Sequence, residues 1–88
     1  MAWRVEVKET AQKQIAKLDR KAQSDVVRYL RERVQQAENP RQFGKVLHGE
    51  QKGLWRYRVG DYRLICDIDD SSRTVVVLAL GHRREVYR

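Results

Sequence analysis

Gly60 and Asp61 form a two-residue turn between two alternating segments, and this turn constrains the fold more than any other feature of the sequence. Glycine in the first of two turn positions is typical of a tight β-hairpin with a fixed register. The sequence therefore predicts an antiparallel hairpin over residues 54–68. The expected pairs are Val59 with Tyr62, Arg58 with Arg63, and Tyr57 with Leu64.

The residues of this hairpin divide between two faces, because side chains alternate along a strand. One face is apolar and is expected to join the core: Trp55, Tyr57, Val59, Tyr62 and Leu64. We call the opposite face, which carries Arg56, Arg58 and Arg63, the arginine face. Like charges directly opposite one another destabilise an antiparallel pair. A polyanionic ligand is the simplest reason to keep three guanidinium groups so close together.

The overall charge points to the same kind of partner. The 88 residues include 19 lysines and arginines against 12 aspartates and glutamates, a formal net charge of +7. Such a charge favours nucleic acid, an anionic surface or an acidic protein as partner. A chain of this length is expected to form a single domain, residues 1–88.

The single cysteine and the absence of long apolar segments bear on the compartment. Cys66 excludes an internal disulfide, which fits a reducing cytoplasm. It lies within an apolar strand, so it is expected to pack as a small hydrophobe rather than to act as a nucleophile. No stretch has the length and hydropathy of a signal peptide or a membrane span, so no membrane partner is expected.

The segment before the hairpin predicts one strand and two helices. Residues 2–8 alternate between apolar and charged side chains, as a half-buried strand does. Apolar residues at helical spacing follow over residues 11–18 and 22–37, with Thr10 and Asp19 as candidate N-caps. The very short interval between them favours an antiparallel helical hairpin. Its apolar stripe needs a surface to cover, and the sheet supplies one.

A loop and a final strand complete the expected fold. Residues 39–53 contain an Asn-Pro helix stop and several glycines, and are expected to form a loop that Val46 and Leu47 anchor to the core. Residues 74–80 are apolar on both faces, which places them in the interior of the sheet. The predicted class is α+β, in the order β-α-α-β-β-β, with a twisted, mostly antiparallel sheet packed against the N-terminal helical hairpin.

The last strand is expected to extend the arginine face. If the turn before it is tight, Arg63 faces Ala79, and Ala79, Gly81 and Arg83 share the face of the arginines. The small side chains of Ala79 and Gly81 would then leave a concave floor with arginines around it.

The hairpin and the C-terminal segment together resemble the RelE/ParE toxins of bacterial type II toxin–antitoxin systems. The resemblance covers essentially all 88 residues and is most specific in residues 53–65 and 80–87. RelE-type members cleave mRNA in the A site of the 30S ribosomal subunit and are neutralised by an antitoxin that wraps around them. The resemblance implies a RelE-like fold and a cytoplasmic endoribonuclease that needs no cofactor and inhibits translation. It also implies a RelB-like antitoxin, through which the complex binds its own operator DNA.

The resemblance assigns catalytic roles residue by residue. Arg56 and Arg58 match the paired basic positions on the strand before the turn, where some RelE-type enzymes carry lysines. Arg63 matches the arginine that follows the tyrosine of the next strand. Arg83 matches the basic residue after the glycine of the last strand, and Tyr87 matches the C-terminal catalytic tyrosine.

The chemistry of RNA cleavage agrees with this set. Attack by a 2′-hydroxyl without a metal needs a base, an acid, and cations for the charge that develops on the phosphorane. The sequence has no cluster of metal-ligand residues at the usual spacing. Guanidinium groups bind phosphate well but are poor proton donors. The expected phosphate-binding residues are Arg56, Arg58, Arg63, Arg83 and Arg84.

Tyr87 and His82 are the groups left to move protons, and which of them acts as base and which as acid stays open. The surrounding cations would lower the pKa of the tyrosine. Tyr87 could instead stack on an unpaired base, and His82 could be an ordinary surface residue. Arg84 could simply pair with a surface carboxylate.

Two other functions stay open. A ParE-type toxin of the same fold would poison DNA gyrase through protein contacts. The co-occurrence of four arginines with Tyr87 favours the ribonuclease, because a gyrase poison does not need this set. A basic, non-catalytic interaction module is the third possibility. The arginines could also bind acidic side chains of an antitoxin, which does not exclude RNA binding.

Overall fold

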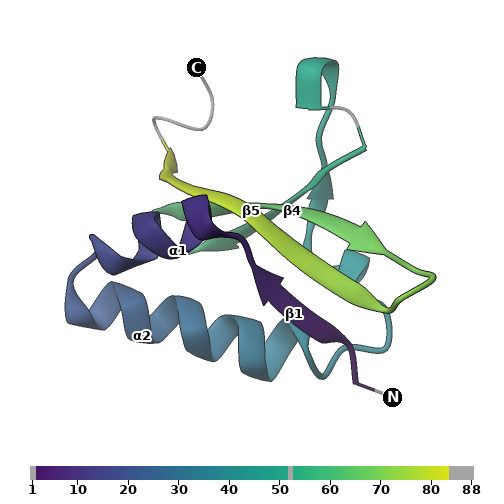
Figure 1. Cartoon of the computed structure of the whole chain (residues 1–88), viewed down its shortest axis with the longest axis horizontal. Helices are drawn as coiled ribbons and strands as arrows, with labels where there is room; N and C mark the ends of the chain where they lie inside the picture. The colour runs from purple at the N-terminus through teal and green to yellow at the C-terminus, as the bar shows by residue number, and fades with distance from the viewer. Residues whose placement is uncertain (1, 52, 84–88) are drawn as a thin grey trace.

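The computed structural model describes residues 2–51 and 53–83, and Figure 1 shows the arrangement of its elements. The strands are β1 (Arg4–Val7), β2 (Lys45–Val46), β3 (Trp55–Val59), β4 (Tyr62–Asp69) and β5 (Thr74–His82). The helices are α1 (Glu9–Ala16), α2 (Arg20–Tyr29), the π-helical turn η1 (Leu30–Val34), and the 3₁₀ turns η2 (Pro40–Phe43) and η3 (Gly49–Gln51).

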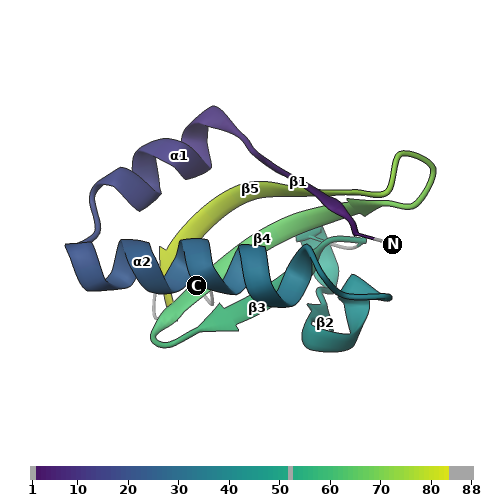
Figure 2. The same ribbon diagram turned by 90° about the horizontal axis from the view of Figure 1, so that it is seen from below.

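The five strands form one sheet in the order β1-β5-β4-β3-β2. β1 pairs with β5 in parallel, and every other pair of neighbours is antiparallel. The predicted α+β class and the mostly antiparallel sheet are therefore confirmed. The sheet twists over α2, which crosses one of its faces, while the segment with η3 rises on the other side (Figures 1 and 2).

The predicted order of helices and strands along the chain is confirmed, with one additional strand, the edge strand β2. We expected residues 39–53 to be a loop, but Lys45 and Val46 pair with β3. Without β2, the outer edge of β3 would present unpaired N–H and C=O groups, and this strand covers part of it. The expected contact of Val46 with the core is wrong, because this side chain is 43% exposed.

Capping explains where the two helices begin. The Asp19 carboxylate accepts a hydrogen bond from the N–H of Ala22 at 2.7 Å, which confirms the predicted cap of α2. The cap predicted at Thr10 is wrong, because α1 begins at Glu9 and its N-cap is Lys8, two residues before Thr10. The N–H of Lys8 still donates to the carbonyl of Val77, so the strand-like backbone extends up to the first residue of the helix.

The core lies between the helices and the sheet. Its fully buried side chains include Val26, Val34, Tyr57, Leu64, Cys66, Val75 and Val77. Trp55 and Tyr62 pack against this cluster while partly exposed, so the predicted apolar face is confirmed. None of the helices in the described part of the chain combines the length and the hydropathy needed to cross a membrane.

Two buried polar groups in this core are accounted for. The hydroxyl of Tyr57 donates to the carbonyl of Pro40 at 2.7 Å, so this fully buried ring keeps a hydrogen-bond partner. Burial raises the pKa of the Cys66 thiol to about 12. Since the thiolate is the reactive form, Cys66 is a packing residue, as its sequence context indicated.

Candidate functional site

The β3–β4 hairpin has the register that the sequence predicts. Gly60 begins the turn with φ of 58°, a backbone conformation that favours glycine. The observed pairs include Val59 with Tyr62, Arg58 with Arg63, and Tyr57 with Leu64. The arginine face therefore lies on the side of the sheet opposite the core, with Arg58 directly across from Arg63.

Arg63 is the buried member of the arginine face, with 6% of its surface exposed. Its Nη1 donates to the backbone carbonyls of Gly60 and Tyr62, at 3.2 and 3.0 Å. These two bonds hold the guanidinium group against the hairpin turn. The sequence predicted the face on which Arg63 lies, but it gave no sign that this arginine would be buried.

The charges around Arg63 show that the predicted arginines lie close together. Burial is the main cause that lowers the pKa of Arg63. The positive charges of Arg58, Arg56 and Arg83 lower this pKa further, whereas Asp61 raises it. The structure therefore brings together four of the predicted site residues from two hairpin strands and the end of β5.

The register between β4 and β5 differs from the expected one by two residues. Arg63 lies opposite Gly81 and not Ala79. The expected pair of Arg63 with Ala79 requires a three-residue connection between the strands. The observed connection spans residues 70–73, which gives the first one-residue shift, and a β-bulge at Leu78 adds the second. Because two one-residue shifts restore the direction of each side chain, Ala79 and Gly81 still share the arginine face.

Two hydrogen bonds fix the end of β5 next to the hairpin turn. The N–H of Arg83 donates to the carbonyl of Asp61 at 2.8 Å. On the other edge of β5, beyond the end of β1, the N–H of Leu80 donates to Oε1 of Gln14 at 2.6 Å. The backbone that leads to Arg83 is therefore held from both sides. Nothing in the sequence indicates this role for Gln14.

His82 lies on the other side of the sheet from the arginines. It pairs with Tyr62, and the two rings meet edge to face with their centroids 5.8 Å apart. Together with Lys17 and Leu18 of the α1 segment, it lines a cavity of about 540 Å³. Since Tyr62 belongs to the core face, the structure does not bring His82 to the arginine face. The remaining predicted site residues, Arg84 and Tyr87, lie outside the described residues.

Lys45 belongs to the arginine face, although the sequence predicts a loop over residues 39–53. In the β2–β3 pair it lies directly opposite Arg56, so the two side chains point to the same side. Lys45 is exposed, and no carboxylate in residues 2–51 or 53–83 forms an ion pair with it. The alternation of Lys45 with Val46 is the only sequence signal for β2, and two residues are too few to indicate a strand.

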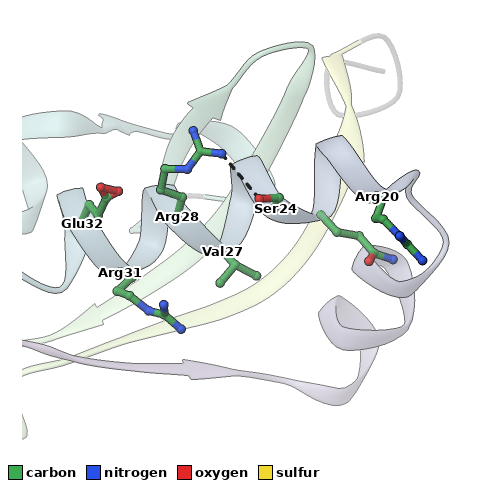
Figure 3. A pocket seen from close by; sticks show the side chains of 7 residues that line it. Arg20, Ser24, Val27, Arg28, Arg31 and Glu32 are labelled. Atoms are coloured by element: carbon green, nitrogen blue, oxygen red, sulfur yellow. Dashed lines mark hydrogen bonds between the residues drawn. The ribbon is translucent and has the colours of Figure 1, made fainter.

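A second basic surface lies on the outer side of α2 (Figure 3). It is a groove of about 550 Å³ in which Val27 is 46% exposed. The lining residues come from α2 and η1: Arg20, Gln23, Ser24, Val27, Arg28, Arg31 and Glu32. Arg28 bonds to Ser24 and to Asp25. Because its charges are partly compensated and no other element contributes to it, this groove is a weaker candidate than the arginine face.

The fold and the arginine face define a small, basic α+β protein with one cationic side of its sheet. A family model for the ParE toxin of type II toxin–antitoxin systems (parDE) matches residues 5–87. The chain therefore belongs to the RelE/ParE family of type II toxins, the family that its sequence resembles.

Individual relatives agree with this assignment. Toxin RelG of Mycobacterium tuberculosis is 45% identical over 49 residues, which are 56% of this chain and 56% of that toxin. The chain thus spans about half the length of this curated relative. The crystal structure of the toxin–antitoxin complex RelBE2 from Mycobacterium tuberculosis has a TM-score of 0.86 at 32% identity, over 94% of this chain and 100% of the other. The archaeal RelE–RelB complex from Pyrococcus horikoshii has a TM-score of 0.76 at 26% identity, over 94% and 97% of the chains.

Proposed function

We propose that this toxin is an endoribonuclease that cleaves mRNA in the A site of the 30S ribosomal subunit and thereby inhibits translation. The observation that carries the proposal is the convergence of Arg56, Arg58 and Arg83 on the buried Arg63. Such a set of fixed cations suits a reaction in which negative charge develops on a phosphate. In the proposed reaction, which uses no metal ion, the neighbouring 2′-hydroxyl loses its proton to a base and attacks the phosphorus. The bond from phosphorus to the 5′-oxygen of the next nucleotide breaks, and an acid protonates this leaving oxygen.

In this proposal the scissile phosphate binds on the arginine face. Guanidinium groups form short, charge-assisted and often bidentate hydrogen bonds to phosphate oxygens. Arg63 is already held by two backbone carbonyls, so it needs little rearrangement to bind the developing charge. Arg58 and Arg83 are exposed and able to close on the phosphate. We include Arg84 as a further phosphate contact.

Proton transfer falls to Tyr87 in this scheme. A phenol surrounded by guanidinium groups has a lowered pKa and exchanges protons more readily. His82 is the second candidate, but its place beside Tyr62 on the core side of the sheet favours Tyr87. The alternative role for Tyr87 is to stack on an unpaired base.

We further propose that a RelB-like antitoxin with acidic side chains covers the arginine face. The high net positive charge of the toxin favours such a partner and speeds its association. The solved structures RelBE2 and archaeal RelE–RelB are a toxin–antitoxin complex and a RelE–RelB complex, which supports an antitoxin partner. The complex would bind its own operator DNA through the antitoxin.

The second candidate function is a ParE-type toxin that poisons DNA gyrase, and the description of the matching family model favours it. Two assays separate the candidates: primer extension on a reporter mRNA after brief induction, and a gyrase-cleavage assay. The ribonuclease gives new mRNA ends and stops protein synthesis. Continued protein synthesis with a DNA-damage response would favour gyrase.

The site assignment is tested by Arg83→Ala and Tyr87→Phe in a reconstituted translation system. Removing one preorganised group that stabilises developing charge costs about a hundred- to a thousandfold in rate. Both variants should therefore lose mRNA cleavage while they melt close to the wild type and still bind the antitoxin. Arg20→Ala, in the groove of α2, is the matched control and should cleave normally.

The outcomes of this experiment are distinct. If only Tyr87→Phe cleaves at the wild-type rate, Tyr87 is a stacking residue, and His82 becomes the leading proton carrier. If both variants cleave like the wild type, the site assignment is wrong.

A further inference from the structure

The cations of the arginine face form a diagonal row made of two pairs on neighbouring strands. Lys45 on β2 lies opposite Arg56 on β3, and Arg58, two residues farther along β3, lies opposite Arg63 on β4. Neighbouring strands are about 4.8 Å apart and two residues advance about 7 Å along a strand, so the row spans roughly 12 Å from Lys45 to Arg63. Stacked nucleotides advance about 3.4 Å along one strand, so the row is longer than a single phosphate needs.

Farther along the strands, the same face carries carboxylates together with Arg4 of β1. Asp67 and Asp69 alternate with the core residues of β4 and are exposed, and Glu6 of β1 is exposed on this side as well. A polyanion that followed the strands would meet these carboxylates. A polyanion that crosses the strands along the diagonal row follows the cations from Arg63 to Lys45, with Asp61 of the turn as a carboxylate near Arg63. The charge pattern therefore favours a ligand that lies across the sheet.

Lys45 has no evident structural role in this row. It is exposed on an edge strand, and its position opposite Arg56 places two positive charges side by side, which destabilises the pair. Within residues 2–51 and 53–83, the ammonium group of Lys45 makes no hydrogen bond to a carbonyl, unlike the guanidinium group of Arg63. This flexible ammonium group acts as a point charge. Such a group suits a phosphate that must be held but does not react.

We propose that Lys45 binds a phosphate adjacent to the scissile one, so that single-stranded RNA lies across the sheet from the end of β5 to β2. This inference rests on the proposed ribonuclease function and adds the path of its substrate. Lys45 is then a substrate-binding residue. It contributes to affinity and not to the chemical step, in contrast to Arg63 and Arg83.

The direct test measures binding of a single-stranded RNA of about ten nucleotides, with 2′-O-methyl groups that prevent cleavage. Fluorescence anisotropy gives the affinity between about 50 and 200 mM salt. The slope of log K against log salt should be smaller by about 0.7 in Lys45→Ala, since one phosphate contact is lost. Lys21→Ala removes the same charge from α2 and should keep the wild-type slope. Lys45→Arg keeps the charge and should also keep the slope.

Equal slopes for Lys45→Ala and Lys21→Ala would overturn the proposal, as would a wild-type toxin that does not bind the oligonucleotide. Cleavage on programmed ribosomes provides the second measurement. Lys45→Ala should raise KM with kcat within about twofold of the wild type, the pattern of lost uniform binding. A large fall in kcat would place Lys45 in the reacting centre and contradict the proposal. If the wild type bound RNA with the expected salt dependence but cleaved none, the ribonuclease function would be contradicted, whereas the contact between Lys45 and an RNA phosphate would still stand.

Discussion

Tyr57 and Arg58 are neighbours in β3, but they belong to faces built in opposite ways. Tyr57 is fully buried on the core face, and its hydroxyl is paired with the carbonyl of Pro40. Arg58 stands on the arginine face directly opposite Arg63, a pair of like charges. The first arrangement stabilises the fold, whereas the second costs stability. One strand thus separates the residues of the core from those of the proposed phosphate site by the direction of alternate side chains.

The sharpest way to break this separation is Arg58→Thr. The proposed site loses a cation, so mRNA cleavage should fall on the order of a hundredfold. The fold should gain up to about 1 kcal/mol, because a like-charge pair is removed and threonine suits a strand. Primer extension and urea denaturation measure the two effects. Arg4→Thr changes an exposed arginine of β1 that lies opposite Thr74 and not opposite a cation, so it should leave cleavage unchanged and gain only the smaller part of the stability that comes from strand propensity. A loss of stability in Arg58→Thr would contradict the comparison.

Tyr57→Phe tests the core face of the same strand. The variant leaves the carbonyl of Pro40 without its buried partner, which should cost about 1–3 kcal/mol of folding free energy. Cleavage per folded molecule should stay at the wild-type level. Tyr29→Phe is the control, because the hydroxyl of Tyr29 makes only a 3.5 Å contact with the carbonyl of Phe43. If Tyr57→Phe loses activity without losing stability, the two faces are not independent.

Gln14→Met tests whether the core side positions the arginine face. Methionine keeps the length of the side chain but offers Leu80 no strong acceptor. The Leu80 amide should exchange with solvent up to about tenfold faster, as expected for the loss of one hydrogen bond. If this bond positions Arg83, kcat should fall a few-fold with KM unchanged. Gln14→Glu keeps an acceptor oxygen and should restore both values; an unchanged exchange rate in Gln14→Met would rule the bond out.

Asp70→Asn addresses charges at the far end of β4, where they compensate each other. Arg41 donates to both carboxylate oxygens of Asp70, at 2.9 and 2.7 Å, and these bonds hold the pKa of Asp70 below its ordinary value of 3.8. A lowered folded-state pKa stabilises the fold above the unfolded-state pKa, and this gain is lost as the pH falls through the folded value. The variant should therefore be slightly less stable than the wild type at neutral pH.

Denaturation at a series of pH values checks this smallest effect. The difference between Asp70→Asn and the wild type should shrink below about pH 4 and vanish once the Asp70 carboxyl is protonated in the folded state. A difference that persists in strong acid would show that the ion pair is not its cause.

The two hairpins show why part of the fold was predictable. Gly60 and Asp61 leave a single register for β3 and β4, so the sequence predicted these pairs correctly. The run from Asp69 to Ser72 predicts a turn, but nothing in the sequence marks that the connection over residues 70–73 ends at Arg73, a non-glycine residue with a positive φ of 50°. The bulge at Leu78 has no signal either, because apolar residues surround it. Ala79 and Gly81 lie on the predicted face only because the two shifts add up to two residues, an even number.

The candidate site was predictable to a similar extent. Alternation was enough to place Arg56, Arg58 and Arg63 together. The same alternation places His82 on the opposite face of the sheet from Gly81 and Arg83, and in the structure His82 pairs with Tyr62 of the core face. Lys45 was missed because a two-residue edge strand has no periodicity of its own. It is recognised only when β3 is present to pair with it.

The parallel pair of β1 and β5 has a consequence for the order in which the toxin assembles. β1 is the first of the described strands to be synthesised and β5 the last, yet Arg4 to Val7 pair directly with Thr74 to Val77. Contacts between residues so distant in the chain are slow to form. On the ribosome, β1 and the helices must wait for β5 to emerge before it can insert between β1 and β4. We expect Arg83 to meet the other arginines only at that moment, so a nascent toxin stays harmless until the final strand has left the ribosome that made it.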